Sequence, residues 1–291
     1  MLINVNFSHR IAAKENDIYN RYQYYLQMKV SQINIYPIKS LGGIDLSEAK
    51  VEVSGFQYDR NWMLVDQKGN FLSQRKHPEM ALLQVEILEK TLLVYHKSKP
   101  WERIEIPSTA KSGINLKTTI WDDTLNALHV DKEVDKWFSA QLKINCSLVK
   151  LDIDNKRFID KTYQINNEYV SFADSMPFLI IGQASLDNLN SRLDEPLPMG
   201  RFRTNLVFSG APPFAEDDWS HIQIGQVKFK VTKPCARCVM TTIDQETGTK
   251  GKEPLKTLSE FRKVDGKVLF GQNLIALNEG IISVGNTIEI N

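Results

Sequence analysis

The chain has 291 residues, of which 42% are hydrophobic and 24% are charged, a composition typical of a globular protein with one large domain or two of ordinary size. Its net charge of +1 creates no global field for nucleic acid or an anionic membrane, and no run approaches the roughly 18 apolar residues of a membrane-spanning helix, so we expect neither partner. Three cysteines, Cys146, Cys235 and Cys238, without a secretory leader fit a reducing, cytoplasmic compartment better than a disulfide framework.

The first 27 residues differ in character from the rest of the chain. They contain AAKENDIYNRYQYYLQ, which is polar and rich in tyrosine and lacks the apolar core and cleavage site of a signal peptide. Met28 is followed directly by a strand pattern. We therefore expect residues 1–27 to be a disordered extension outside the fold, with an N-terminal helix docked on the domain as the alternative.

Short strands separated by turns dominate the stretch from residue 28 to about 145. Alternating patterns predict strands in VSQINIYPI, KVEVSGFQY, NWMLVDQKGNFLS, TLLVYHK and WERIEIP. The segment Asp66–Asn70 separates two apolar runs and predicts a hairpin turn, whereas PEMALLQVEILEK fits a helix or a strand. Asp131 is a suitable N-cap for a helix over KEVDKWFSAQL, with Val134, Trp137 and Phe138 on one face.

A second group of strands follows. The pattern predicts strands in CSLVKLD, NLVFSG, IQIGQVKFKVTKP, CVMTTID, KVLFGQNLIALNEG and ISVGNTIEI. Ser185 fits the N-cap of a helix over SLDNLNSRL, and Glu253-Pro254 fits the start of another that packs through Leu255 and Leu258. Long helices do not alternate with strands, which excludes a doubly wound nucleotide fold. The sequence predicts a mainly β protein with a few helices, in two parts joined near residues 140–150.

The motif KPCARCVMTTID places Cys235 and Cys238 three positions apart. A redox dithiol needs its reactive cysteine at a helix N-terminus, and the β-branched run after Cys238 disfavours a helix there. A structural zinc site needs four ligands, but Cys146 is distant and the spacing of His221 suggests no ligand. Two readings remain, a pair of buried core thiols or a thiolate beside Arg237 that suits a soft metal or an anionic cofactor.

These segments resemble a known family. PCARCVMTTIDQETG with KEPLKTL resembles the signature of MOSC domains, and YPIKSLGGIDLSEAKVEVSGFQYDRNWMLVD resembles the β-barrel domain that precedes them. The combination is most similar to the amidoxime-reducing components of mitochondria and their bacterial relatives. The resemblance runs from about Met28 to the C-terminus. It implies a MOSC N-terminal β-barrel-like domain at 28–145, a MOSC β-barrel domain at 146–291, and a cofactor cleft between them.

The resemblance implies molybdenum bound to a pyranopterin, the molybdenum cofactor, with one cysteine thiolate on the metal. The matching residue is Cys238, and Cys235 is then a packing or neighbouring thiol. Further residues match the family's cofactor contacts, although without the resemblance each would also fit an ordinary turn, a solvated cation or a cation stacked on an aromatic ring. The sequence departs from the family at Thr204, where the family often has proline. Asp174 is also a candidate catalytic proton relay. The implied cofactor contacts are Lys39, Ser40, Arg60, Asp174, Ser175, Arg203, Asn205, Arg237, Cys238 and Asn273.

The function implied is an oxidoreductase that reduces small N-hydroxylated compounds such as hydroxylamines, amidoximes and N-hydroxylated bases. The sequence contains no haem motif or plant-type ferredoxin spacing, so we expect electrons from a separate donor of the flavin reductase, ferredoxin or cytochrome b5 type. Two alternatives are a non-catalytic cofactor carrier or sulfur-transfer protein, and a β-barrel scaffold in which Cys238 is a core thiol.

Overall fold

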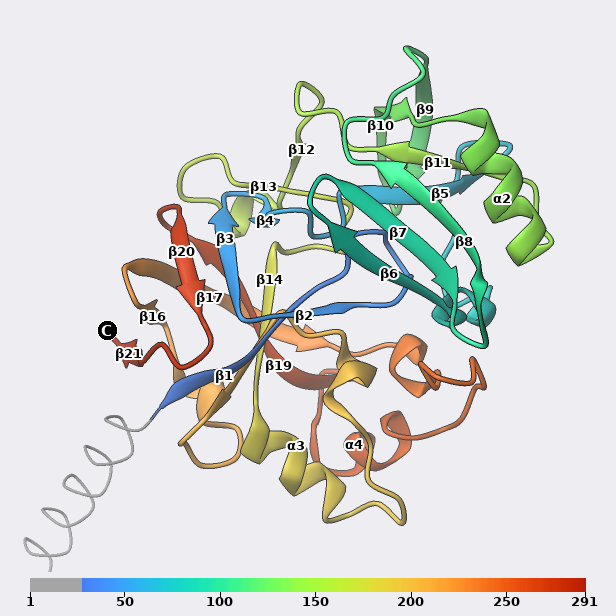
Figure 1. Cartoon of the computed structure of the whole chain (residues 1–291). Coiled ribbons are helices and arrows are strands. Elements are labelled where there is room, and N and C mark those ends of the chain that lie inside the picture. The colour runs from blue at the N-terminus through green and yellow to red at the C-terminus, as the bar shows by residue number, and fades with distance from the viewer. Residues whose placement is uncertain (1–27) are drawn as a thin grey trace, which may run out of the picture.

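The computed structural model describes residues 28–291 (Figure 1). The prediction for residues 1–27 lies outside the described residues. Strands dominate the described part, which contains three α-helices and confirms the mainly β class. None of the helices in this part is long and apolar enough to cross a membrane.

The central element is a nine-stranded sheet built mostly from the second half of the chain (Figure 1). Its strand order is β2-β1-β15-β14-β19-β17-β16-β21, with β18 paired to β19. In this sheet β14 and β15 run parallel, and the other neighbouring strands are antiparallel. The strands are β1 (Lys29–Ile35), β2 (Ile44–Leu46), β14 (Phe178–Gly182), β15 (Leu206–Ser209), β16 (His221–Ile224), β17 (Val227–Ala236), β18 (Lys263–Val264), β19 (Lys267–Ala276) and β21 (Ile288–Ile290).

Two smaller sheets form the unit at the upper right of Figure 1. The first has the order β5-β11-β10-β9, with β5 (Trp62–Asp66), β9 (Asn115–Ile120), β10 (Asp123–His129) and β11 (Cys146–Lys150). The second is a meander of β6 (Leu83–Leu88), β7 (Thr91–His96) and β8 (Lys99–Pro107). The predicted turn over Asp66–Asn70 is confirmed, since Gly69 takes the left-handed backbone conformation and the Asp66 amide donates to the Asn70 carbonyl.

Strand pairing crosses the predicted domain line. β1 and β2 belong to the nine-stranded sheet, and β3 (Glu48–Glu52) with β4 (Gly55–Phe56) pairs with β20 (Gly280–Ser283) near the C-terminus. β11, just after residue 145, joins β5 of the first half. The ranges 28–145 and 146–291 remain a prediction, while the sheets are assembled across that line. A last pair, β12 (Arg157–Phe158) and β13 (Tyr169–Val170), lies within the second range.

Two of the three predicted helices begin where expected. In α2 (Lys132–Leu142) the Asp131 side chain accepts from the Glu133 amide, and Val134 and Phe138 are buried. α4 (Leu255–Phe261) follows Pro254 and buries Leu258. α3 (Gln183–Asn190) starts earlier than predicted, with Gly182 as its N-cap. Ser185 is instead fully buried inside the helix, where its hydroxyl donates to Glu216 at 2.9 Å.

The prediction of a strand over CVMTTID was wrong. Val239–Thr242 forms a 3₁₀ turn, η5, with Cys238 at its N-cap position. The two threonines explain the difference, because Thr241 Oγ1 donates to the Cys238 carbonyl at 3.0 Å and Thr242 Oγ1 to the Val239 carbonyl at 2.8 Å. Such local bonds compete with a sheet ladder. The other 3₁₀ turns are η1 (Pro78–Leu82), η2 (Lys161–Tyr163), η3 (Met199–Phe202) and η4 (Ala215–Asp218); η1 and β6 share the ambiguous segment at 78–90.

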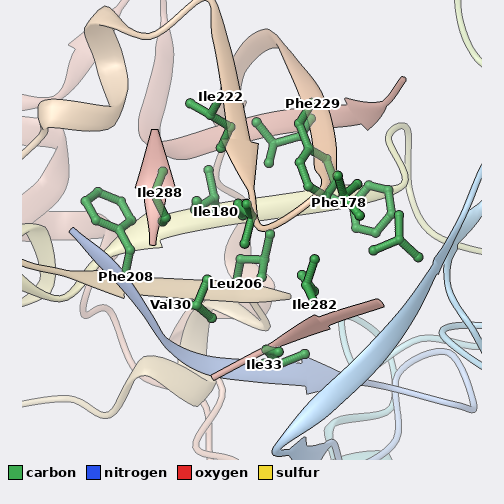
Figure 2. Packing of buried hydrophobic residues seen from close by; sticks show 14 of the residues in the cluster. Val30, Ile33, Phe178, Ile180, Leu206, Phe208, Ile222, Phe229, Ile282 and Ile288 are labelled. Carbon is green, nitrogen blue, oxygen red and sulfur yellow. The ribbon is translucent and has the colours of Figure 1, made fainter. Parts of the chain in front are cut away.

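The largest core packs side chains of the nine-stranded sheet against those of the small sheet of β20, β3 and β4 (Figure 2). Phe178 meets Phe229 edge to face, with ring centroids 5.4 Å apart, and both are essentially inaccessible. Burying each such side chain stabilises the fold by about 1.5–3 kcal/mol. A separate core around Trp62 and Phe138 supports the smaller sheets. These cores make the walls of the site rigid.

Candidate functional site

One cavity of about 480 Å³ brings together all ten residues predicted to contact a cofactor. Its walls come from the loop after β1, the loop before β14, the segment before β15, the end of β17 and the start of β19. The residues are far apart in sequence, and the crossing of β1 into the large sheet is what places them side by side. The lining includes Lys39, Ser40, Arg60, Asp174, Ser175, Arg203, Asn205, Arg237, Cys238 and Asn273.

The two cysteines of the motif make different contacts. Cys235 packs against the apolar cluster that contains Phe202 and Phe270, and it accepts from Arg237 Nη1 at 2.9 Å. Cys238, after β17 ends, accepts from Arg75 Nε at 3.4 Å. Both thiols are reduced and partly exposed. Both thiols line the cavity and each accepts a hydrogen bond from an arginine. Cys235 differs in packing against the apolar cluster, which fits the packing role predicted for it.

Lys39 and Asp174 form an ion pair in the wall. Lys39 Nζ lies 2.5 Å from Asp174 Oδ1 and 2.8 Å from the Phe172 carbonyl oxygen. Burial lowers the pKa of Lys39 to about 8, against the opposing effect of Asp174. Burial alone would raise the pKa of Asp174, but Lys39 and Arg75 hold it well below its usual range. Asp174 is therefore a carboxylate at neutral pH that accepts hydrogen bonds, and its lowered pKa disfavours the proton relay predicted for it.

The ring of Tyr36 packs against two of the cavity's arginines. The guanidinium carbons of Arg60 and Arg203 lie 4.4 and 4.1 Å from its ring centroid, close enough for cation–π attraction. Arg60 also pairs with Asp59 and donates to Asn205 Oδ1 at 3.1 Å, while Asn205 Nδ2 donates to Asp59. Burial lowers the pKa of Arg203 to about 10, which still leaves it charged at neutral pH.

Three predicted contact residues have an uncommon backbone conformation. Ser40, Arg60 and Arg203 have φ values of 69°, 51° and 51°, in the left-handed region that residues with a Cβ adopt rarely. Each instance costs of order 1–3 kcal/mol and persists only where the surroundings fix it. Arg60 is supported by its hydrogen bond to Asn205 and by the Tyr36 ring, and Arg203 by its hydrogen bond to the Leu41 carbonyl at 2.6 Å and by the same ring.

The cavity is strongly cationic. Its lining contains two acidic residues, Asp174 and Asp265, and eight basic residues: Lys39, Arg60, Arg75, Arg201, Arg203, Lys233, Arg237 and Lys267. Two buried polar atoms of the lining, Ser40 Oγ and Arg237 Nε, have no hydrogen-bond partner. Buried donors of this kind are normally satisfied, so the cavity fits a ligand rich in acceptor oxygens, such as a phosphate.

The chain itself supplies few metal ligands. Within residues 28–291 no group of three or more His, Cys, Asp or Glu side chains is arranged to hold a metal, and His221 lies in β16, outside the cavity lining. A metal at Cys238 would therefore take most of its ligands from its own cofactor. The site thus needs a ligand that brings metal-binding atoms and also acceptor oxygens for the cationic lining. A phosphorylated dithiolene pterin has both, since its sulfurs bind a soft metal and its phosphate oxygens pair with the cations. The residues present fit the molybdenum cofactor.

The sequence did not single out Arg75, Arg201 or Lys267, which also line the cavity. Arg75 stands in SQRKHPEM, where no periodicity or motif distinguishes it from a surface arginine. Asn273, the weakest of the predicted contacts, is 8% exposed and donates Nδ2 to the Lys233 carbonyl at 3.2 Å, which holds β19 against β17.

Comparisons with known proteins agree with these features. The model of the MOSC N-terminal beta barrel domain matches residues 27–145, and that of the MOSC domain matches residues 167–289. The "Mitochondrial amidoxime-reducing component 1" of Mus musculus is 32% identical over 279 residues, which cover 90% of this chain and 82% of that protein. The Homo sapiens protein of the same description is 31% identical over 280 residues, with the same coverage. The "Molybdenum cofactor sulfurase" of Arabidopsis thaliana is 33% identical over 83% of this chain but only 32% of its own length.

Proposed function

Since the chain belongs to the family that joins a MOSC N-terminal beta barrel domain to a MOSC domain, we propose that it is a molybdenum-cofactor-dependent oxidoreductase that reduces N-hydroxylated compounds. The observation that carries the proposal is a cavity that combines the thiol of Cys238 with eight basic side chains and only two acidic ones. Such a cavity suits an anionic cofactor that brings most of its own metal ligands. The names of the two amidoxime-reducing relatives support the choice of substrate class.

The bound cofactor supplies the two-electron chemistry that removes oxygen from nitrogen. The chain would hold it through Cys238 and, at the phosphate, through the cations Lys39 and Arg203. Asn205, whose side-chain amide already bonds to Arg60 and Asp59, would hold Arg60 in the lining. Asp174, held as a carboxylate by Lys39 and Arg75, accepts hydrogen bonds in the cavity lining. The surrounding apolar cores fix these groups before the ligand arrives, which lowers the entropic cost of binding.

The reductase needs electrons from a separate protein. We propose a donor of the flavin reductase, ferredoxin or cytochrome b5 type, and a cytoplasmic location, both as inferred from the sequence. A second function, cofactor carrier or sulfur-transfer protein, is favoured by the similarity to a molybdenum cofactor sulfurase. In that case Cys238 would hold cofactor or a persulfide without turnover.

The decisive experiment measures molybdenum and oxidised-pterin fluorescence in protein from a host that makes the cofactor. Native protein, Cys238→Ala and Cys235→Ala are compared. We expect about one molybdenum per chain in native protein and in Cys235→Ala, and none in Cys238→Ala. Reduction of a hydroxylamine with an artificial electron donor then separates the reductase from the carrier. Absence of both molybdenum and pterin from all three would overturn the proposal.

A further inference from the structure

Arg75 belongs to the loop that follows β5, a strand of the smaller sheets, and its side chain lines the cavity. It lies between β5 and η1, and its side chain is 19% exposed. Its Nε donates to Cys238 Sγ at 3.4 Å, and its Nη2 donates to Asp174 Oδ2 at 2.9 Å. A single guanidinium therefore contacts both the predicted metal ligand and the carboxylate of the cavity, with two N–H groups in fixed relative directions.

The position of Arg75 is itself fixed from two other segments. Its guanidinium lies over the ring of Trp121, with 4.6 Å between the guanidinium carbon and the ring centroid, and Trp121 packs against Phe71. Trp121 occupies the turn between β9 and β10 with φ 55°, and its Nε1 donates to Asp174 at 3.4 Å. On the other side, Lys250 Nζ donates to the Arg75 carbonyl at 2.8 Å. These contacts restrict the rotamers of a side chain that would otherwise be mobile.

We propose that Arg75 is a positioning residue that sets the direction of the Cys238 sulfur and the Asp174 carboxylate, so that the smaller sheets complete a site otherwise built on the large sheet. The metal-related part of this inference rests on the proposed function; the arrangement of sulfur, guanidinium and carboxylate does not. A hydrogen bond donated to a ligating sulfur also tunes the metal that it binds. Arg75 would thus affect the metal without touching it.

The first test uses metal-free protein and a ratio of rates. Cys238 is alkylated at one pH with anionic iodoacetate and with neutral iodoacetamide, and the site is identified by peptide mass spectrometry. The ratio of the two rates cancels the fraction of thiolate and reports the cation beside the sulfur. We expect Arg75→Met to lower the ratio roughly threefold to tenfold and Arg75→Lys to restore part of it.

The matched control is Lys76→Met, which removes the same charge from the neighbouring, exposed residue. We expect it to leave the ratio within about twofold of the native value, since a solvated charge acts weakly. Thermal unfolding of each variant verifies the fold, and Trp121→Leu should reproduce part of the Arg75→Met effect. An unchanged ratio in Arg75→Met, or an equal fall in Lys76→Met, would refute the inference.

The second test uses cofactor-loaded protein and a spectroscopic signature. We expect Arg75→Met to retain less molybdenum after gel filtration and to shift the electron paramagnetic resonance signal of its Mo(V) state, with Arg75→Lys intermediate. Identical retention and an identical signal in Arg75→Met would count against the inference. If native protein takes up no molybdenum, the proposed function fails, and the alkylation ratio alone still decides the role of Arg75.

Discussion

Lys39 and Asp174 meet across the wall of the cavity, with Nζ and Oδ1 2.5 Å apart. Lys39 follows β1 and Asp174 precedes β14, so the pair joins a loop of the first strand to the centre of the large sheet. Lys39 is almost wholly buried, whereas the Asp174 side chain is 49% exposed and faces the cavity. Both side chains line the cavity, and the carboxylate is the more exposed of the two.

Asp174→Asn should destabilise the fold. The substitution leaves the buried ammonium of Lys39 without its carboxylate, at a cost of about 1–2 kcal/mol, less than for a fully buried pair because Asp174 is half exposed. Urea unfolding at pH 7 measures the change. The control is Asp265→Asn, another carboxylate of the lining for which no ion pair is found among the described residues. An effect of equal size there would contradict the argument.

Binding of anions in the metal-free cavity should weaken as pH rises through about 8, the pKa of Lys39. Below that value Lys39 is protonated and attracts an anion, and above it the charge is lost. Burial lowers this pKa, Asp174 opposes the shift, and the charges of Arg75 and Arg157 add to it. Sulfate is the probe, since its charge is constant over the range, and a background with Cys235→Ser and Cys238→Ser removes both cavity thiols. Calorimetric affinity that is constant from pH 7 to 9 would contradict the prediction.

Removing Lys39 provides the control for the pH experiment. Lys39→Met should bind sulfate more weakly at pH 7 and show no midpoint near 8. In Asp174→Asn the midpoint should move to lower pH, because the carboxylate raises the pKa of Lys39.

Tyr36→Leu should cost about 2–4 kcal/mol of stability and lower cofactor retention, because the change removes a buried ring and the surface on which Arg60 and Arg203 rest. Tyr36→Phe keeps the ring and loses only a long hydrogen bond, from the hydroxyl to the Thr204 carbonyl at 3.3 Å. The phenylalanine variant should therefore stay within about 1 kcal/mol of native and keep the cofactor. Thermal unfolding and molybdenum content distinguish the two variants; similar losses in both would exclude a role for the ring.

Thr242→Val should destabilise the turn that holds Cys238. Valine has nearly the same shape but lacks the hydroxyl that donates to the Val239 carbonyl at 2.8 Å, so the expected cost is about 1 kcal/mol. Thr249→Val, at an exposed position, should change stability by less than about 0.5 kcal/mol. Equal unfolding midpoints for native protein and Thr242→Val would show that the hydroxyl does not support the turn.

The sequence predicted elements whose signals are local. α2 was recognisable because an N-cap aspartate precedes an apolar stripe, and the strands because their apolar residues alternate. The η5 turn was missed because β-branched residues favour strands on average, while here the threonine hydroxyls bond to the preceding turn. Ser185 resembled an N-cap, but its partner Glu216 comes from a distant segment and is invisible to a local pattern.

The residues of the site divide in the same way, into those with a local sequence signal and those that only tertiary contacts identify. Residues within recognisable motifs, such as Lys39 in YPIKS and Cys238 in CARC, could be placed in one cavity by resemblance. Arg75 could not, because its significance depends on Trp121 and Asp174, which the fold alone brings to it. The crossing of β1 into the large sheet was likewise unpredictable, since strand partners depend on tertiary packing.

The pairing of β1 with β15 constrains the order in which the parts form during synthesis. β1 leaves the ribosome early, but β15 follows only after the smaller sheets and α3 have been made. The meander of β6, β7 and β8 has neighbouring partners and can close at once, whereas β1 must wait with its edge exposed. The cavity, whose walls extend to Asn273, is therefore completed last. A ligand that contacts all of these walls can bind only after Asn273 has been synthesised.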